Sequence, residues 1–256
     1  MVRPEADVTL SFSSSALLLV YQAGVAEAFL NSPQFMASVR EVHGCSGGAL
    51  VGALLLAGEE ALLKVKAYLQ SGQAFRGIGF AEICDPARLI PRAVEESGAM
   101  SEDTYQRLSG RLHVMCTKGG MFRHASPVSY SSFDSNEELV QILQATSSFA
   151  YEGVSVKGEA HWDGGICDVL PVPEHCNKER VVTVAPVCAR HVSVCPDAGL
   201  WRLPGSVGQH GWRICAQSLM AAWDCTFMFS SRRMMKYWAQ GRADGEVFLR
   251  SRGYVE

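Results

Sequence analysis

Hydrophobic positions along the chain recur with two alternating periods. Val8, Leu10 and Phe12 alternate with polar neighbours, which is typical of a strand, and residues 16–30 carry apolar side chains at helical spacing. The pattern then repeats as a short strand over 40–43, a glycine-rich turn, and an apolar helix over 49–57. Two strand-turn-helix units therefore open the chain, which indicates an α/β fold.

The rest of the sequence continues this alternation of strands and helices. Helices are predicted over 59–69, 101–108, 135–143 and about 214–239, and strands over 112–117, 127–133, 159–162 and 180–186. Ser135 and Glu138 form a capping box, in which the serine oxygen and the glutamate each satisfy an orphan amide. No repeat or Pro-rich linker divides the chain. We expect one domain over residues 8–175 and a mostly helical C-terminal extension over 176–256.

Composition narrows the class of protein. With 256 residues, 48% of them hydrophobic and 19% charged, the chain can bury a sizeable core. A net charge of −3 gives little attraction to a phosphate backbone, so nucleic acid is not an expected partner. The nine cysteines form no C-x-x-C pair, the N-terminus is acidic, and the uncharged stretch 8–26 is interrupted by serines. These features predict a reduced, cytoplasmic protein whose membrane contact is peripheral.

Two glycine-rich motifs carry candidate chemistry. Residues 44–48 read G-C-S-G-G, a G-x-S-x-G motif between a predicted strand and helix, and the serine of such a turn is exposed for nucleophilic attack. Ser46 is therefore the candidate nucleophile, and Cys45 is expected to be a small core residue. Residues 163–165 read D-G-G after an extended stretch, and Asp163 is the candidate base because Gly164 and Gly165 let its side chain approach another group.

Together these motifs resemble the patatin-like phospholipases, and among them the branch that contains adipose triglyceride lipase. The resemblance runs over residues 8–173 and rests on GCSGGALVGALLLAG, SNEELVQIL, WDGGICDVLPVP and TVAPVCARHVSVCP. It implies a three-layer α/β/α fold with a central, mainly parallel sheet. It also implies a Ser46–Asp163 dyad that cleaves acyl esters of acylglycerols or phospholipids without a cofactor or a metal.

One expected motif is replaced. Members of the family carry a G-x-G-x-x-G loop after the first strand, whose amides are thought to bind the oxyanion, and the matching glycines are here Ser14, Ala16 and Leu19. A serine-rich turn can still cap a helix and present amides to an anion. We therefore expect oxyanion donors from Gly47 and from Ser14, Ser15 and Ala16. Gly44 and Gly48 are expected to allow the sharp turn that carries Ser46. The resulting prediction is a lipid acyl hydrolase, with a catalytically weakened lipid-binding relative and an acylglycerol transacylase as alternatives.

Other readings of the sequence remain open. An α/β-hydrolase triad would use Ser46, Asp163 and one of His175, His191 or His210. Cysteines and histidines gather at 175–195, but their spacing is not a recurrent zinc motif, so no metal is expected. Aromatic, methionine and basic residues crowd the C-terminal part, which either packs on the domain or docks on a lipid droplet or membrane. The chain carries no motif that identifies an activating protein partner.

Overall fold

The computed structural model describes residues 8–79, 82, 85–119, 124–149, 152–174, 176, 180–186, 192–196, 224 and 230–255. The strands are β1 Val8–Phe12, β2 Val39–Cys45, β3 Leu112–Lys118, β4 Ser126–Tyr130, β5 Val154–Val156, β6 Glu159–Trp162 and β7 Val181–Val184. The α-helices are α1 Leu19–Leu30, α2 Pro33–Ser38, α3 Gly47–Ala57, α4 Glu59–Ser71, α6 Leu89–Ser97, α7 Thr104–Leu108, α8 Asn136–Ala145 and α10 Ser231–Ser251. Short 3₁₀ turns are η1 Ala16–Leu18, η2 Gln73–Phe75, η3 Pro86–Arg88 and η4 Gly164–Ile166.

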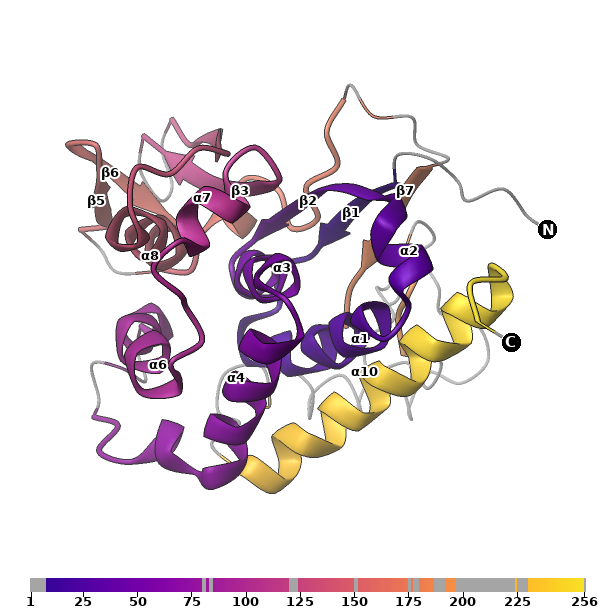
Figure 1. Cartoon of the computed structure of the whole chain (residues 1–256). Coiled ribbons are helices and arrows are strands. Elements are labelled where there is room, and N and C mark those ends of the chain that lie inside the picture. The colour runs from indigo at the N-terminus through magenta and orange to yellow at the C-terminus, as the bar shows by residue number, and fades with distance from the viewer. Residues whose placement is uncertain are drawn as a thin grey trace, which may run out of the picture.

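The strands form one sheet in the order β5-β6-β3-β2-β1-β7, with β4 also paired to β3. β1 runs parallel to β2 and β7, β2 runs parallel to β3, and the antiparallel pairings are confined to the margin made by β4, β5 and β6. Helices flank this sheet (Figure 1). The predicted α/β class with a central, mainly parallel sheet is therefore confirmed, and the strand ends of its parallel centre position the candidate site.

Strand β1 is buried on both faces, although its alternating sequence is typical of a strand with one polar face. Thr9 is 5% exposed and Ser11 is fully buried. The hydroxyl of Ser11 donates to the carbonyl of Pro171 at 2.6 Å, and that of Thr9 donates to Glu41 at 3.1 Å. A central parallel strand is covered on both sides, so these polar side chains are stabilised by hydrogen bonds and not by solvent.

The predicted cap of α8 is present with one changed partner. The Ser135 hydroxyl accepts the amide of Glu138 at 3.2 Å, whereas the Glu138 carboxylate accepts the amide of Asp134 at 2.6 Å, one residue before the cap. Both acceptors satisfy amides at the helix start, as a capping box requires. The helix runs to Ala145, two residues further than predicted.

The C-terminal helix α10 lies along α1 (Figure 1). Met234 and Trp238 are buried in this contact, and the indole of Trp238 donates to the carboxylate of Glu27. These two members of the C-terminal group of aromatic and methionine residues thus pack on the domain. The helix continues to Ser251, beyond its predicted end at Ala239. Met235, a further member of this group, is partly buried against the hydrophobic core. The other members lie outside the described residues: Trp201, Trp212, Met220, Trp223, Phe227, Met228 and Phe229.

Gly241→Ala tests this helix contact. A Cβ at position 241 would collide with the carbonyl oxygen of Tyr21 on α1, which is backbone and cannot turn aside. Alanine has the better helix propensity by about 1 kcal/mol, but overpacking costs typically 1–3 kcal/mol and occasionally more. We therefore expect a net loss in the free energy of unfolding, measured by urea denaturation. Ala239→Val, exposed on the same helix, is the control and should stay close to wild type; equal effects of the two would contradict the close contact.

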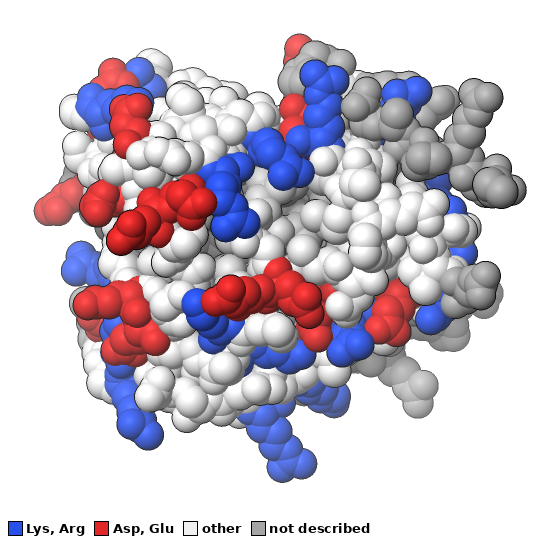
Figure 2. Space-filling model, viewed as in Figure 1, with Lys and Arg blue, Asp and Glu red and all other residues white. Residues whose placement is uncertain are grey.

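The surface carries charges of both signs. On the face shown in Figure 2, acidic and basic side chains are interspersed and separated by uncharged surface, so no large single-sign field covers this view. None of the helices in the described ranges combines the length and the apolar composition that a membrane span requires.

Candidate active site

Ser46 occupies a strained turn between β2 and α3. Its backbone has φ 52° and ψ −133°, a combination that costs of order 1–3 kcal/mol in a non-glycine residue and clusters at active sites. The turn is cramped, because a Cβ on Gly48 would collide with the carbonyl of Phe12. The amide of Ser46 donates to the hydroxyl of Thr146 at 2.9 Å, and Thr146 in turn donates to the carbonyl of Met115. The predicted strand-turn-helix context of Ser46 is therefore present.

Asp163 follows β6 and is fully buried. Its Oδ1 accepts the amide of Gly165 at 2.7 Å, and its backbone carbonyl accepts the hydroxyl of Thr117 at 2.8 Å. Gly164 presses against β3, where a Cβ would collide with the carbonyl of Met115. The D-G-G motif thus combines a locally bonded carboxylate with a backbone that must approach the sheet closely, which explains why small residues follow the aspartate.

The fold brings Ser46 and Asp163 together although 117 positions separate their numbers in the chain. Burial, with a smaller contribution from the carboxylate of Asp85, raises the pKa of Asp163 to about 6, against the opposing effects of the Ser46 hydroxyl and the Gly165 amide. Within the described residues, Asp163 Oδ2 accepts no hydrogen bond. Catalytic hydrogen bonds are often long in structures without substrate and tighten in the complex. Ser46 is near enough to affect this pKa, and Oδ2 is the carboxylate oxygen that no described donor occupies.

The serine turn after β1 differs in part from expectation. The amide of Ser14 donates to the carbonyl of Val169 at 2.8 Å, so this expected oxyanion donor is already engaged and the expectation for it was wrong. Ser15 and Ala16 adjoin Gly47, since a Cβ on Gly47 would lie 2.7 Å from Ser15 Oγ and 2.9 Å from Ala16 O. Gly47 is in the first turn of α3, where amides have no partner within the helix. The two remaining candidate sources of oxyanion donors, Gly47 and the turn at Ser15 and Ala16, therefore lie side by side.

Gln22 supports this turn, a role that the sequence analysis missed. Its side-chain amide is fully buried in α1 and donates to the carbonyl of Ser13 at 3.0 Å, to the hydroxyl of Ser13 at 2.9 Å and to the carbonyl of Val184 at 3.3 Å. Its oxygen accepts the hydroxyl of Ser15 at 3.4 Å. A glutamine among the apolar residues of the first half of α1 was the available signal, because a buried amide requires partners.

An apolar cavity of about 240 Å³ borders Ser46. Its wall includes Ser46, Gly47 and Ala16, and it extends along α3 and between α4 and α6. The α3 side chains on this wall share one helix face: Leu50, Ala53, Leu54 and Ala57. Since a helix rises 1.5 Å per residue, this face extends roughly 15 Å from Gly47 to Ala57. The shape suits a long apolar chain whose polar end lies at the serine.

Comparison with known proteins decides the family. The family model for patatin-like phospholipase matches residues 10–174. The chain belongs to the patatin-like phospholipase family. Curated relatives include the omega-hydroxyceramide transacylase of Mus musculus, which is 26% identical over 66% of this chain and 28% of the relative.

Two further relatives of this patatin-like protein match the whole or nearly the whole chain. The 1-acylglycerol-3-phosphate O-acyltransferase Pnpla3 of Mus musculus is 24% identical over 99% of this chain and 61% of its own length. Patatin-like phospholipase domain-containing protein 2 of Bos taurus is 26% identical over 100% of this chain and 52% of its own length. The chain thus spans between 28% and 61% of these three relatives.

The histidines of the alternative triad are not among the described residues. His175, His191 and His210 all lie outside them, as do Cys188 and most of the cysteine and histidine group at 175–195. In the described part of this patatin-like chain, the Asp163 carboxylate bonds to the Gly165 amide and to no imidazole. Cys45 is buried, as predicted, and burial raises the pKa of its thiol well above the usual value. The alternative triad therefore stays a prediction, and the dyad hypothesis depends on Ser46 and Asp163 alone.

Ala16→Gly tests the replaced glycine loop. Ala16 stands where the family carries its second loop glycine, and it adopts a positive φ of 43°. A left-handed conformation costs an L-residue roughly 1–2 kcal/mol, and glycine avoids this cost. Glycine also makes the unfolded chain more flexible, which offsets part of the gain in stability. We expect Ala16→Gly to raise the free energy of unfolding by about 1 kcal/mol. Ala23→Gly, buried in α1, is the control and should be destabilising; a loss of stability in both variants would contradict a strained Ala16.

Proposed function

We propose that this protein is a serine-dependent lipid acyl hydrolase in which Ser46 attacks the ester carbonyl and Asp163 is the base. One observation carries the proposal: the Ser46 hydroxyl borders an apolar cavity and lies next to a buried carboxylate whose pKa, about 6, is close to neutrality. A base with a pKa near the working pH combines the ionised form with useful proton affinity. The coarser proposal, acyl-ester chemistry on a lipid, also has support from the family model.

The proposed reaction passes through an acyl-serine. Ser46 Oγ forms a bond to the acyl carbon while its proton passes to Asp163 Oδ2, and the protonated Asp163 then donates to the leaving alcohol. Water, deprotonated by the same carboxylate, attacks the acyl carbon; the bond to Ser46 Oγ then breaks, Asp163 returns the proton to Oγ, and the fatty acid is released. The amides of Gly47 and of the Ser15–Ala16 turn would stabilise the oxyanion, a contribution worth about 10²–10³ in rate for each donor. No histidine, cofactor or metal enters this sequence of steps.

Acyl transfer is the second candidate, and the relatives favour it specifically. Two of the three are a transacylase and an O-acyltransferase by name. The acyl-serine would be common to both reactions, and only the nucleophile of the second step differs. We propose that the reaction takes place in the cytoplasm at the surface of a lipid droplet or membrane, where acyl esters and lipid acceptors are both present. Measuring free fatty acid and transferred acyl product with and without added lipid alcohol separates the two reactions.

Ala53→Phe tests whether the cavity holds the acyl chain. Ala53 lies on the wall, roughly 9 Å along α3 from Gly47, and a phenylalanine there would fill the distal part. Each buried methylene is worth about 0.8 kcal/mol, so excluding four of them corresponds to roughly 3 kcal/mol and about a 100-fold loss. We expect kcat/KM for long-chain esters to fall by this order, with short-chain esters little changed.

The control for this variant is Leu63→Phe, at a side chain that is 45% exposed and outside the cavity wall. It should leave the chain-length profile unchanged. An equal loss for short and long chains in Ala53→Phe would mean that the cavity does not bind the acyl chain. Absence of any ester turnover in the wild type, with retained lipid binding, would favour the catalytically weakened relative.

A further inference from the structure

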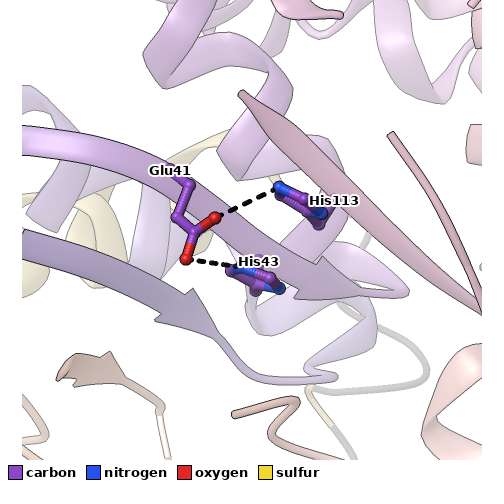
Figure 3. Close-up of side chains that lie close together, drawn as sticks. All are labelled: Glu41, His43 and His113. Carbon is purple, nitrogen blue, oxygen red and sulfur yellow. Dashed lines mark ion pairs between the residues drawn. The ribbon is translucent and has the colours of Figure 1, made fainter. Parts of the chain in front are cut away.

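A polar cluster lies on the face of the sheet away from α3. Val42 of β2 and Leu112 of β3 face α3, where both approach Gly52. Because side chains alternate along a strand, Glu41, His43 and His113 project from the opposite face. His43 and His113 are register partners on the two parallel strands. Figure 3 shows their imidazoles side by side, with the carboxylate of Glu41 reaching both. The proposed hydrolase mechanism uses none of the three.

The distances within this cluster suit a bound cation. Glu41 Oε1 lies 3.4 Å from His43 Nε2, and Oε2 lies 3.4 Å from His113 Nε2. One ligand atom from each residue lies within 4.8 Å of the others. Two atoms that each bind a tetrahedral zinc at 2.0–2.1 Å are roughly 3.3 Å apart. Each imidazole nitrogen therefore already lies at nearly the separation of two ligands around one ion from one oxygen of the Glu41 carboxylate.

The surroundings hold the cluster in place and leave it partly open. The imidazole rings stack in parallel, with centroids 4.2 Å apart and an angle of 9°. Glu41 Oε1 also accepts the hydroxyl of Thr9 at 3.1 Å and the thiol of Cys176 at 3.1 Å. Such outer contacts orient metal ligands in known sites. The side chain of His43 is 8% exposed and that of His113 is 22% exposed, and the Nε2 atoms of both rings are buried. An ion between them would therefore be shielded from solvent, with the exposed edge of His113 nearest to the surface.

We infer that Glu41, His43 and His113 bind one divalent transition-metal ion, with zinc as the reference metal. Two imidazoles and one carboxylate suit zinc and its first-row neighbours, whereas magnesium and calcium prefer ligand sets made of oxygen alone. Three protein ligands leave one position of a tetrahedral ion for water or a further donor. This proposal differs from the expectation, made from the sequence, that the protein binds no metal. It arose from local spacing, and these ligands come from two strands that are distant in sequence.

A metal ion in this position would cross-link β2 to β3 just before the Ser46 turn, on the face that the acyl cavity does not use. Binding to the folded state alone adds to stability by mass action. The site would therefore stabilise the strand that carries the nucleophile without contacting the substrate. Its test is independent of acyl-ester turnover, so failure of the proposed hydrolase function would leave it standing.

The experiment is zinc titration of the full chain, produced without a polyhistidine tag and first dialysed against a chelator. Calorimetry and bound-metal analysis should show about one zinc per chain, and the thermal midpoint should rise with zinc. His113→Gln and Glu41→Gln each remove a ligand while keeping a polar side chain. Each should weaken zinc binding by more than the roughly 10–100-fold that loss of an outer contact costs. His124→Gln, at an exposed histidine outside the cluster, is the matched control and should bind as wild type.

A second measurement needs no variant. Zinc should slow the modification of His113 by diethyl pyrocarbonate, mapped by mass spectrometry, while His124 reacts at an unchanged rate. Failure of the wild type to bind zinc would overturn the inference. So would binding that survives in both ligand variants but is lost in Cys188→Ser and His191→Gln, because the ion would then occupy the cysteine and histidine group at 175–195.

Discussion

Ser46→Ala is expected to abolish labelling of the protein by a fluorophosphonate probe and to lower acyl-ester turnover by on the order of 10⁴-fold or more, as loss of a catalytic serine does in other hydrolases. The reason is geometric: Ser46 is the hydroxyl in the strained turn, and it alters the pKa of Asp163. Alanine has no oxygen to form the acyl-enzyme. Intact-mass analysis of the probe adduct and a fatty-acid release assay measure the two effects.

The matched control is Ser147→Ala. Ser147 also borders the cavity, and its hydroxyl is buried without a hydrogen-bond partner in the described part of the chain. It is not at a strained turn, and Asp163 shows no influence from it. Ser147→Ala should label like wild type. A probe adduct that persists in Ser46→Ala, or that disappears in Ser147→Ala, would contradict the assignment of the nucleophile.

Asp163→Asn is expected to lower turnover by about 10²–10⁴-fold while making the protein more stable at neutral pH. The loss of rate follows because an amide cannot accept the Ser46 proton, and general-base catalysis typically contributes that factor. In the wild type, kcat/KM should fall as the pH decreases through about 6, since only the ionised carboxylate is a base. Asp163→Asn should lose this inflection along with its activity. A pH–rate profile and a fatty-acid release assay measure both effects.

The gain in stability follows from the direction of the pKa shift. Burial raises the pKa of Asp163 from 3.8 to about 6 in the folded protein, so the folded state holds the proton more tightly than the unfolded chain. The stabilisation from this proton is complete below 3.8 and is lost as the pH rises through 6, by up to about 3 kcal/mol. Asparagine stays neutral, and its oxygen can still accept the Gly165 amide. The difference in unfolding free energy between Asp163→Asn and wild type should therefore grow between pH 4 and 7.

Asp168→Asn serves as the control for both effects. Asp168 is the next carboxylate along the chain, and it accepts the amide of Leu170 at 3.0 Å. This variant should keep both the activity and the pH dependence of the wild type. If Asp163→Asn were instead destabilised at pH 7 as much as at pH 4, burial would not raise the pKa of Asp163 as predicted, and its role as base would lose its physical support.

The local part of this fold was open to prediction from short patterns. The alternation of apolar residues predicted β1, β2, β3 and β6, and the helical spacing predicted α4 within two residues of its end. G-C-S-G-G indicated the turn of Ser46, because a sharp turn between a strand and a helix tolerates only small residues around the serine. Ser135 indicated the start of α8, since a hydroxyl that caps an amide three residues away needs no distant partner. Each of these predictions depends on contacts within a few residues.

The outcome was different where partners come from far along the chain. The engagement of the Ser14 amide by Val169, the support of Ser13 by Gln22, and the full burial of Ser11 became visible only in the folded protein. The glycine pattern showed that Ala16 was unusual, but its positive φ is held by neighbours that the pattern does not contain.

By itself, the sequence determined the family motifs, the alternation of strands and helices except for α2, α6 and β5, and the two side chains proposed to carry the chemistry. Only the tertiary structure decided that Ser46 borders an apolar cavity, that burial brings the pKa of Asp163 to about 6, and that two histidines stack beside Glu41. The physical reason is the range of each interaction. Backbone geometry follows from neighbouring residues, whereas burial, electrostatics and cavity shape depend on side chains that only packing of the whole sheet and its helices brings together.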